Sequence, residues 1–311
     1  MPIPFLGELF AVVSAFFYGL SAVAIIKNAE NGHTDNGAYL SVLMTAAMAG
    51  GLWLVIGSPL PPAGPELWYG IAYFVLAGFL ANIFGRVLMF RTVELVGAVE
   101  IGILRRLIPV FAALLAVAFL GERINLSVAT GFLLVAAGVA SVMVSSRRAK
   151  AAPRTGGPMP LERTPQNLRR GRILGTVSSA SYGGAYVSRK FALAGLPDPL
   201  MGTFIGAVTG LICGAAIAHV SRRGRADFRS LFRRPAAWQV VAAASVSLGQ
   251  IAQFFALSHT TVTAVAIIGS VEMFISAWLS AVLLKSERKP GLGFAVASLL
   301  ALAGTIVIAL G

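Results

Sequence analysis

Apolar residues gather in ten runs along the sequence, and each run is about as long as a membrane-crossing helix. A bilayer core of about 30 Å takes roughly twenty residues of α-helix. The runs cover residues 5–26, 38–57, 68–90, 97–120, 125–146, 173–194, 199–220, 237–258, 261–284 and 290–310. Turn residues separate them, as in Pro59–Pro62 and Pro197–Pro199. The pattern predicts an all-α integral membrane protein with ten transmembrane helices.

The sequence also repeats itself at a shift of 164 or 165 residues. The motif V-S-x-x-x-Y-G occurs at Val13–Gly19 and again at Val177–Gly183, and Phe90–Arg123 aligns without a gap on Phe255–Arg288. Each repeat then holds five helices. Because five is odd, the second repeat must enter the membrane in the opposite direction to the first. We therefore expect two inverted five-helix repeats.

The repeat sets the expected domain boundaries. Residues 1–146 form the first five-helix unit, and residues 173–311 form the second. The segment 147–172 between them is rich in Pro, Gly and Arg and lacks apolar periodicity. This composition predicts a flexible basic linker between the two units.

Basic residues mark one face of the predicted membrane domain. The chain is 57% hydrophobic and only 12% charged, with a net charge of +13. Nineteen Lys and Arg residues lie in the loops after the first, third, fifth, seventh and ninth runs, against three on the opposite face, namely Arg123, Arg189 and Lys190. By the positive-inside rule, the face with nineteen is cytoplasmic and both termini are outside. This distribution explains the basic excess without a nucleic-acid partner.

Two further motifs carry a family resemblance. Tyr18–Gly19 and Tyr182–Gly183 place an aromatic residue before glycine in the first helix of each unit, and Pro109–Leu115 leads to Leu120–Arg123. With these motifs the chain resembles the drug/metabolite transporter superfamily, specifically its ten-helix EamA-type members. The resemblance implies a secondary transporter that exports or exchanges small metabolites, such as amino acids or related polar solutes, by alternating access. It also implies a multi-pass protein of the plasma membrane, which is the inner membrane in bacteria. Members of this size commonly keep both termini in the cytoplasm, whereas the charge count here predicts the reverse.

Arg105, Arg106 and Glu272 lie in the middle of predicted spans, where charge is costly. A mid-span Arg costs about 2.5–3.5 kcal/mol for insertion, whereas each Leu, Ile, Val or Phe returns only about 0.3–0.6 kcal/mol. The charged face of the 97–120 helix must therefore look toward water, substrate or another charge. Two interpretations are open: Arg105 or Arg106 binds an anionic group of the substrate, or Arg106 and Glu272 form a structural ion pair. If protons are coupled to transport, Glu272 is the candidate carboxylate.

Four polar side chains are further candidates for the wall of a central cavity. Asn82 and Arg86 are four residues apart and share a helix face, and Gln250 and Gln253 are three apart on the corresponding helix of the second unit. Both pairs suit contact with a substrate and hydrogen bonds between helices about equally well.

Three tyrosines form a second group of candidates. Tyr18 and Tyr182 each precede a glycine that allows close backbone approach, and Tyr186 lies one helical turn after Tyr182. These rings suit a wall on which a substrate stacks, although ordinary helix packing explains them too.

The 125–146 and 290–310 helices carry no charge within their spans and are rich in small residues, among them Gly131 and Gly304. Such faces allow close helix packing. Packing within one chain is the default expectation, and it leaves a monomer or a weak homodimer open.

A different functional class is a membrane-embedded enzyme acting on a lipid or an isoprenoid carrier. Such an enzyme needs clustered Asp, Glu or His side chains. His33, His219 and His259 are scattered, however, and neither an H-E-x-x-H nor a G-x-x-x-x-G-K-[ST] motif is present. We expect no enzymatic activity and no cofactor or metal. A translocator of lipids or lipid-linked precursors stays open as the alternative, since it would use the same scaffold.

Overall fold

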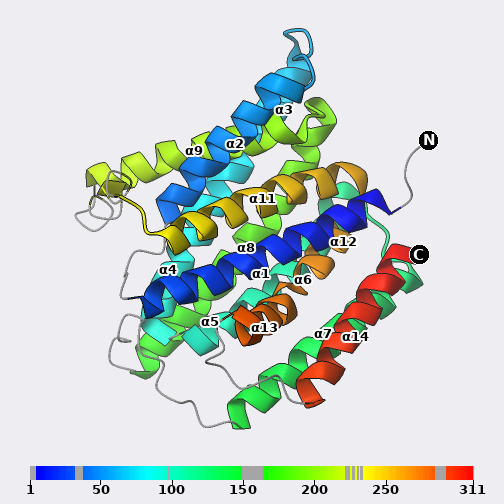
Figure 1. Cartoon of the computed structure of the whole chain (residues 1–311). Coiled ribbons are helices and arrows are strands. Elements are labelled where there is room, and N and C mark those ends of the chain that lie inside the picture. Colours follow the sequence, from blue (N-terminus) through cyan, green and yellow to red (C-terminus); the bar gives the residue numbers. More distant parts are fainter. Residues whose placement is uncertain are drawn as a thin grey trace.

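Helices make up all the regular structure in the part of the chain that the computed structural model describes (Figure 1). That part comprises residues 5–31, 38–96, 98–148, 164–220, 234–283 and 292–310, together with residues 225, 228, 229 and 231. The helices are α1 (Leu6–Glu30), α2 (Ala38–Ile56), α3 (Pro65–Phe79), η1 (Leu80–Val87), α4 (Leu88–Val96), α5 (Ala98–Leu104), η2 (Arg105–Leu107), α6 (Ile108–Leu115), η3 (Ala116–Leu120), α7 (Leu126–Arg148), α8 (Pro165–Gly195), α9 (Pro199–Val220), α11 (Ala237–His259), α12 (Val262–Gly269), α13 (Glu272–Leu283) and α14 (Leu292–Leu310). Of these, η1 and η3 are π-helices and η2 is a 3-10 helix.

Eight stretches of the described chain are long and apolar enough to cross a membrane. They are Leu6–Glu30, Ala38–Ile56, Pro65–Val93, Glu100–Leu120, Pro199–Val220, Ala237–His259, Val262–Val282 and Leu292–Leu310. Leu126–Ser141 is a shorter apolar helix. The prediction of an all-α integral membrane protein is confirmed. The long helix α8 is not in this set, because arginine and serine side chains lower its hydropathy.

The connection between the two predicted units contains fewer non-helical residues than expected. α8 begins at Pro165, and the hydroxyl of Thr164 accepts a hydrogen bond from the Asn167 N–H at 3.2 Å. Thr at the cap and Pro at the first helical position both favour a helix start. Residues 165–172, which were expected in a flexible linker, therefore belong to α8. Residues 149–163 of that linker lie outside the described part of the chain.

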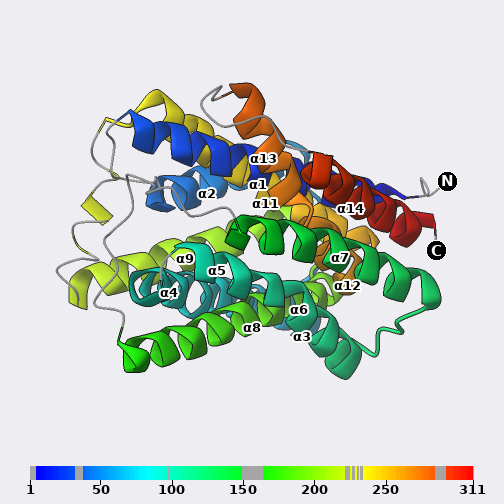
Figure 2. The ribbon, with the colours of Figure 1, turned by 90° about the horizontal axis from the view of Figure 1, so that it is seen from below.

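The two ends of the bundle differ in the loops that they carry. The start of α1 and the end of α14 lie at the same end in two perpendicular views (Figures 1 and 2). The end of α1, the start of α2, the start of α8, the end of α9 and the start of α11 gather at the opposite end. These helix ends adjoin loops of the strongly basic set. We therefore name the two ends the terminal end and the basic end.

The apolar core lies in the half of the bundle nearer the terminal end. Its largest fully buried side chains include Phe74 in α3, Phe254 and Leu257 late in α11, and Ile267 in α12. α1 packs along α11, and α8 packs against α3, α4 and α6. Burial of a large apolar side chain contributes about 1.5–3 kcal/mol, so this dense half holds the two repeats together at the terminal end.

α7 and α14 form a pair of their own at one side of the bundle (Figure 1). A Cβ atom added at Gly131 would lie 2.7 Å from the carbonyl oxygen of Gly304, and one at Gly304 would lie 2.7 Å from that of Gly131. The two backbones are in direct contact because neither residue has a side chain. The small-residue faces of these helices therefore meet within one chain.

Candidate functional site

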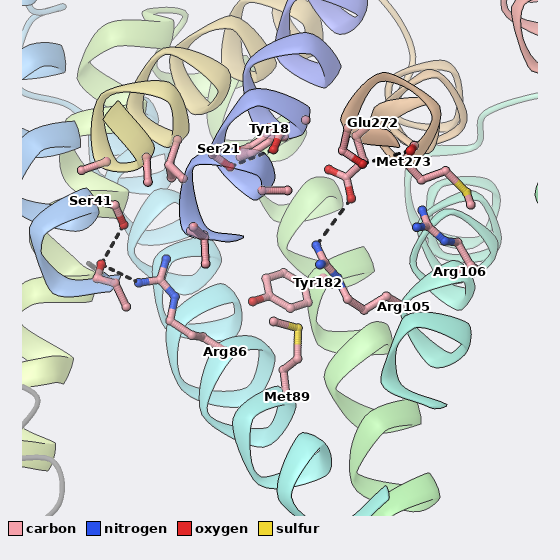
Figure 3. A pocket seen from close by; sticks show the side chains of 18 residues that line it. Tyr18, Ser21, Ser41, Arg86, Met89, Arg105, Arg106, Tyr182, Glu272 and Met273 are labelled. Atoms are coloured by element: carbon pink, nitrogen blue, oxygen red, sulfur yellow. Dashed lines mark hydrogen bonds and ion pairs between the residues drawn. The ribbon is translucent and has the colours of Figure 1, made fainter. Parts of the chain in front are cut away.

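A cavity of roughly 390 Å³ lies between the helices of the two predicted repeats (Figure 3). Its walls come from α1, α2, η1, α4 and η2 of the first repeat and from α8, α11 and α13 of the second. Many of the lining residues belong to the halves of the helices nearer the basic end, such as Ile25 late in α1 and Ala242 early in α11. Its polar and charged lining side chains are Tyr18, Ser21, Ser41, Arg86, Arg105, Arg106, Tyr182, Glu272 and Ser276.

Two central helices are broken at this cavity, at equivalent positions of the two repeats. The first, which we name the composite helix, runs from α5 through η2 and α6 to η3 and contains the 3-10 turn Arg105–Leu107. The second, the broken helix, consists of α12 and α13, which are separated by a turn at residues 270 and 271. The repeat shift of 165 residues places Arg105–Leu107 on Ser270–Glu272. Interrupted helices are tolerated at membrane depth where they are buried in protein or line a water-filled cavity.

Arg105 and Glu272 form an ion pair in the cavity, with Arg105 Nη2 3.6 Å from Glu272 Oε1 (Figure 3). The two side chains are 45% and 26% exposed, so water reaches both. One of the two interpretations left open from the sequence was a structural ion pair between Arg106 and Glu272, and the structure pairs Glu272 with Arg105 instead. Arg106 lies beside Met273 in Figure 3 and makes no ion pair with any residue that the structure describes. The ion pair between Arg105 and Glu272 therefore joins the composite helix of the first repeat to the broken helix of the second.

Arg86 reaches the cavity from the π-helix η1. Its Nη1 donates a long hydrogen bond of 3.4 Å to the carbonyl oxygen of Ala38, at the start of α2 (Figure 3). Ser178 Oγ in α8 donates a hydrogen bond of 2.6 Å to the carbonyl oxygen of Gly85 and so ties the π-helix to the second repeat. π-helices are rare and occur frequently at functional sites. The local winding here directs a third guanidinium into the same space as Arg105 and Arg106.

The two Tyr–Gly pairs hold the first helix of each repeat against the other repeat. A Cβ atom added at Gly183 would lie 2.8 Å from the backbone nitrogen of Ala112 in α6, and one at Gly19 would lie 3.1 Å from the carbonyl oxygen of Glu272. The expected close backbone approach occurs at both glycines. Each approach puts the preceding tyrosine, Tyr18 or Tyr182, on the cavity wall.

Polar contacts close the bundle at its terminal end. Glu122, just after η3, accepts a hydrogen bond of 2.7 Å from the Thr263 hydroxyl in α12. Lys190 Nζ in α8 donates a hydrogen bond of 2.8 Å to the carbonyl oxygen of Thr260, and the Thr260 hydroxyl donates one to Glu8 in α1. These contacts link both repeats across the end opposite to the basic loops. The cavity therefore faces the basic end.

A family model described as the EamA-like transporter family matches the chain twice, over residues 5–144 and over residues 169–310. The chain belongs to the EamA-like transporter family. The resemblance that rests on the Tyr–Gly pairs and on Pro109–Arg123 is thus confirmed, and the chain is a multi-pass membrane transporter of the drug/metabolite type. Its fold is similar to that of a crystal structure described only as that of a protein, with a TM-score of 0.64, 15% sequence identity and 97% of each chain covered. No curated protein sequence matches the chain.

In this EamA-like transporter, six of the ten residues predicted for the site line the cavity, and four do not. The four others are Asn82, Tyr186, Gln250 and Gln253. Asn82 faces Gly210 of α9. The Tyr186 hydroxyl accepts a hydrogen bond of 2.7 Å from Gln253 Nε2, so these two side chains bond to each other. Gln250 is half-buried in α11, away from the cavity lining.

The same EamA-like transporter buries a charge, Arg189, that the sequence assigned to the less basic face. Arg189 is only 7% exposed. Its guanidinium donates a hydrogen bond to Gln253 Oε1 and lies over the Phe254 ring, 4.7 Å from the centroid. The amide and the ring offset part of the cost of burying the charge. A signal was present in the sequence, since Tyr182, Tyr186 and Arg189 follow a helical i, i+4, i+7 spacing on one face.

Proposed function

We propose that this chain is a secondary transporter that exports or exchanges small metabolites, such as amino acids or related polar solutes, by alternating access. The observation that carries the proposal is the charged cavity of roughly 390 Å³, a volume typical of a small-molecule site. Within it, Arg105 of one repeat pairs with Glu272 of the other. Because water reaches this ion pair, a charged group of a solute can replace one of the two side chains and pair with the other.

The proposed transporter crosses the plasma membrane ten times. Its fifth and sixth crossings are the apolar part of α7, Leu126–Ser141, and the polar helix α8. The contact between Glu122 at the end of the composite helix and Thr263 at the start of the broken helix supports inverted repeats. Two neighbouring helices that meet end to start run in opposite directions. With the basic end in the cytoplasm, both termini are outside.

In the proposed cycle, the structure corresponds to the state that opens toward the basic end. Rocking of one repeat against the other breaks the contacts of Glu122 and Lys190 at the terminal end and closes the cavity from the basic side. In this motion the helices of one repeat slide past those of the other at the close backbone contacts of Gly19 and Gly183. Glu272 is the carboxylate that carries a coupled proton if transport responds to a pH gradient. A monomer suffices for this cycle, because both repeats are in one chain.

The test is a counterflow assay with the purified full-length protein in liposomes. The vesicles are loaded with pooled amino acids, nucleosides and sugar phosphates, and uptake of labelled members of each class is followed with and without a pH gradient. We expect saturable exchange of one class, reduced at least tenfold by Glu272→Gln and by Arg105→Gln. Glu30→Gln is the matched control, because it removes an exposed carboxylate that pairs with Lys27 outside the cavity; it should change the rate less than twofold.

The outcomes separate the competing interpretations. Absence of exchange for every class, together with scrambling of labelled lipid between leaflets, would overturn the metabolite transporter and establish the lipid translocator. Exchange that a pH gradient accelerates in the parent protein but not in Glu272→Gln assigns the coupled proton to that carboxylate. An exchange rate that is the same with and without the pH gradient identifies transport that is not coupled to protons.

A further inference from the structure

A second, smaller pocket adjoins the cavity. It measures roughly 200 Å³ and lies between α6, α7 and α12. Its wall is largely apolar, with Val110 from α6, Phe132 and Val135 from α7 and Ile267 from α12. Arg106 and Ser270 are the polar side chains on this wall, and the Ser270 hydroxyl already donates a hydrogen bond to the carbonyl oxygen of Ala266. The pocket thus combines an apolar interior with one guanidinium.

Arg106 lines both spaces, the cavity and the side pocket. The carboxylate of Glu272 is paired with Arg105 and attracts Arg106 only from beyond ion-pair distance, and none of the described residues forms a hydrogen bond or an ion pair with Arg106. A guanidinium at membrane depth is costly unless an anion or water meets it. The position of Arg106 therefore favours an anionic group in the cavity, with an apolar space directly beside it.

We propose that the cargo is an organic anion with an apolar group of about ring size, whose charged group lies against Arg106 while the apolar group enters the side pocket. This assignment rests on the proposed transporter function, because it identifies the bound anion as the transported solute. The volume fits: an apolar cavity of about 150 Å³ accommodates a benzene molecule. The apolar wall of the side pocket shields the ring from water, and the planar guanidinium of Arg106 can donate two hydrogen bonds to the anionic group.

The depth of Arg106 argues for a soluble cargo over a resident phospholipid. Arg106 lies six residues after Glu100, the first residue of the membrane-crossing stretch Glu100–Leu120, which corresponds to about 9 Å along the helix axis. The lipid headgroups lie at the surface of a hydrocarbon core whose half-thickness is about 15 Å. An anion at Arg106 thus lies well below the lipid headgroups, at a depth where the cavity from the basic end gives access to water-soluble molecules.

The experiment measures binding to the purified, delipidated protein by isothermal titration calorimetry. The probes are benzenesulfonate, methanesulfonate and benzenesulfonamide, which carry ring and charge, charge alone, and ring alone. We expect benzenesulfonate to bind at least tenfold more tightly than either of the others. Ala136→Phe fills the side pocket and should reduce this preference to less than twofold, with Ala136→Leu intermediate. Ala137→Phe, on the exposed face of the same helix, is the control and should keep the preference.

Arg106 is tested in the same assay. Arg106→Gln should weaken both sulfonates at least tenfold and leave benzenesulfonamide unchanged, whereas Arg106→Lys should retain part of the affinity for both anions. Equal affinity for the two sulfonates, or a preference that survives Ala136→Phe, would overturn the side-pocket assignment. Competition by added phosphatidylglycerol that disappears in Ala136→Phe would overturn it too, by assigning the pocket to a lipid.

The two proposals fail in different ways. Counterflow of small polar solutes without any preference for benzenesulfonate refutes the side pocket and leaves the transporter intact. Tight binding of benzenesulfonate with no counterflow of any solute refutes the transporter function, and with it the identification of the anion as cargo.

Discussion

Glu122 Oε2 accepts two hydrogen bonds from Thr263, one from the backbone N–H at 3.1 Å and one from the hydroxyl at 2.7 Å. The other carboxylate oxygen accepts a hydrogen bond from the Val262 N–H at 2.6 Å. These bonds satisfy N–H groups at the start of α12 that have no partner within the helix, and the helix dipole favours a negative charge there. The end of the first repeat's composite helix thus caps the start of the second repeat's broken helix.

Removal of the Glu122 carboxylate should increase the fraction of molecules in which the terminal end of the bundle is open. A hydrogen bond to a charged group contributes about 1.5–3 kcal/mol, and a change of about 1.4 kcal/mol corresponds to a tenfold shift in an equilibrium constant. We expect Glu122→Ala to increase the exposure of Leu257, a fully buried residue near this end, at least tenfold. The measurement is the rate at which an impermeant maleimide labels Leu257→Cys in a Cys213→Ser background.

Two further variants control this experiment. Glu122→Gln retains a neutral acceptor oxygen and should label at an intermediate rate. Glu66→Ala removes an exposed carboxylate from the first turn of α3, at the same end of the bundle, and should leave the rate unchanged. Equal labelling rates in the Glu122→Ala protein and its parent would show that this cap does not hold the end closed.

The Arg105–Glu272 ion pair should matter more for transport than for stability. Its side chains are 45% and 26% exposed, and ion pairs in contact with water typically contribute about 0.2–1 kcal/mol. A double-mutant cycle with Arg105→Gln and Glu272→Gln, measured by unfolding in a detergent titration, should give a coupling free energy below about 1 kcal/mol. A coupling near 3 kcal/mol or above would identify a structural pair and weaken its assignment to the transport site.

The cost of charge in a membrane was enough to locate the central residues of the cavity from the sequence. Arg105, Arg106 and Glu272 all line it, because that argument depends only on depth along the helix. It did not identify which arginine pairs with Glu272. Successive side chains are about 100° apart around an α-helix but about 120° apart around a 3-10 helix, and the 3-10 turn begins at Arg105. The apolar pattern predicts the span but not this break, whose one local signal is Pro109 in the first turn of α6.

Sequence reasoning also failed to predict which helices pack side by side. Arg189 was counted among the three basic residues of the less basic face, yet its partners Gln253 and Phe254 come from α11. Gln253 was in turn expected on the cavity wall. Hydropathy gives the position of a residue along the membrane normal. Which helix lies beside it depends on packing between segments far apart in the chain.

The glycine of the second Tyr–Gly pair should be intolerant of a side chain. A Cβ atom at Gly183 would lie 2.8 Å from the backbone nitrogen of Ala112 and 3.0 Å from the carbonyl carbon of Phe111, and backbone atoms cannot move aside cheaply. We expect Gly183→Ala to lower the free energy of unfolding by about 1–3 kcal/mol. The adjacent Gly184→Ala is the matched control, since its nearest neighbour would be Leu80 Cδ1 at 3.5 Å.

Gly184→Ala should be neutral or slightly stabilising, because Gly in a helix interior costs about 0.5–1 kcal/mol relative to Ala. Thermal unfolding of the two variants in the same detergent gives the comparison. Similar losses in both would mean that helix flexibility, and not the contact with α6, determines the requirement for glycine.

Gln253 should contribute to stability mainly as the hydrogen-bond acceptor of the buried Arg189 guanidinium. Gln253→Leu leaves the guanidinium without its acceptor, and we expect it to lower the free energy of unfolding by about 3 kcal/mol. Arg189→Met combined with Gln253→Leu removes charge and acceptor together and replaces them with side chains of similar volume. Because buried polar partners can be replaced jointly at little cost, the double variant should recover most of the loss. A double variant no more stable than Gln253→Leu would show that the Phe254 and Tyr186 rings, which lie 4.7 Å and 5.7 Å from the guanidinium, require the cation itself.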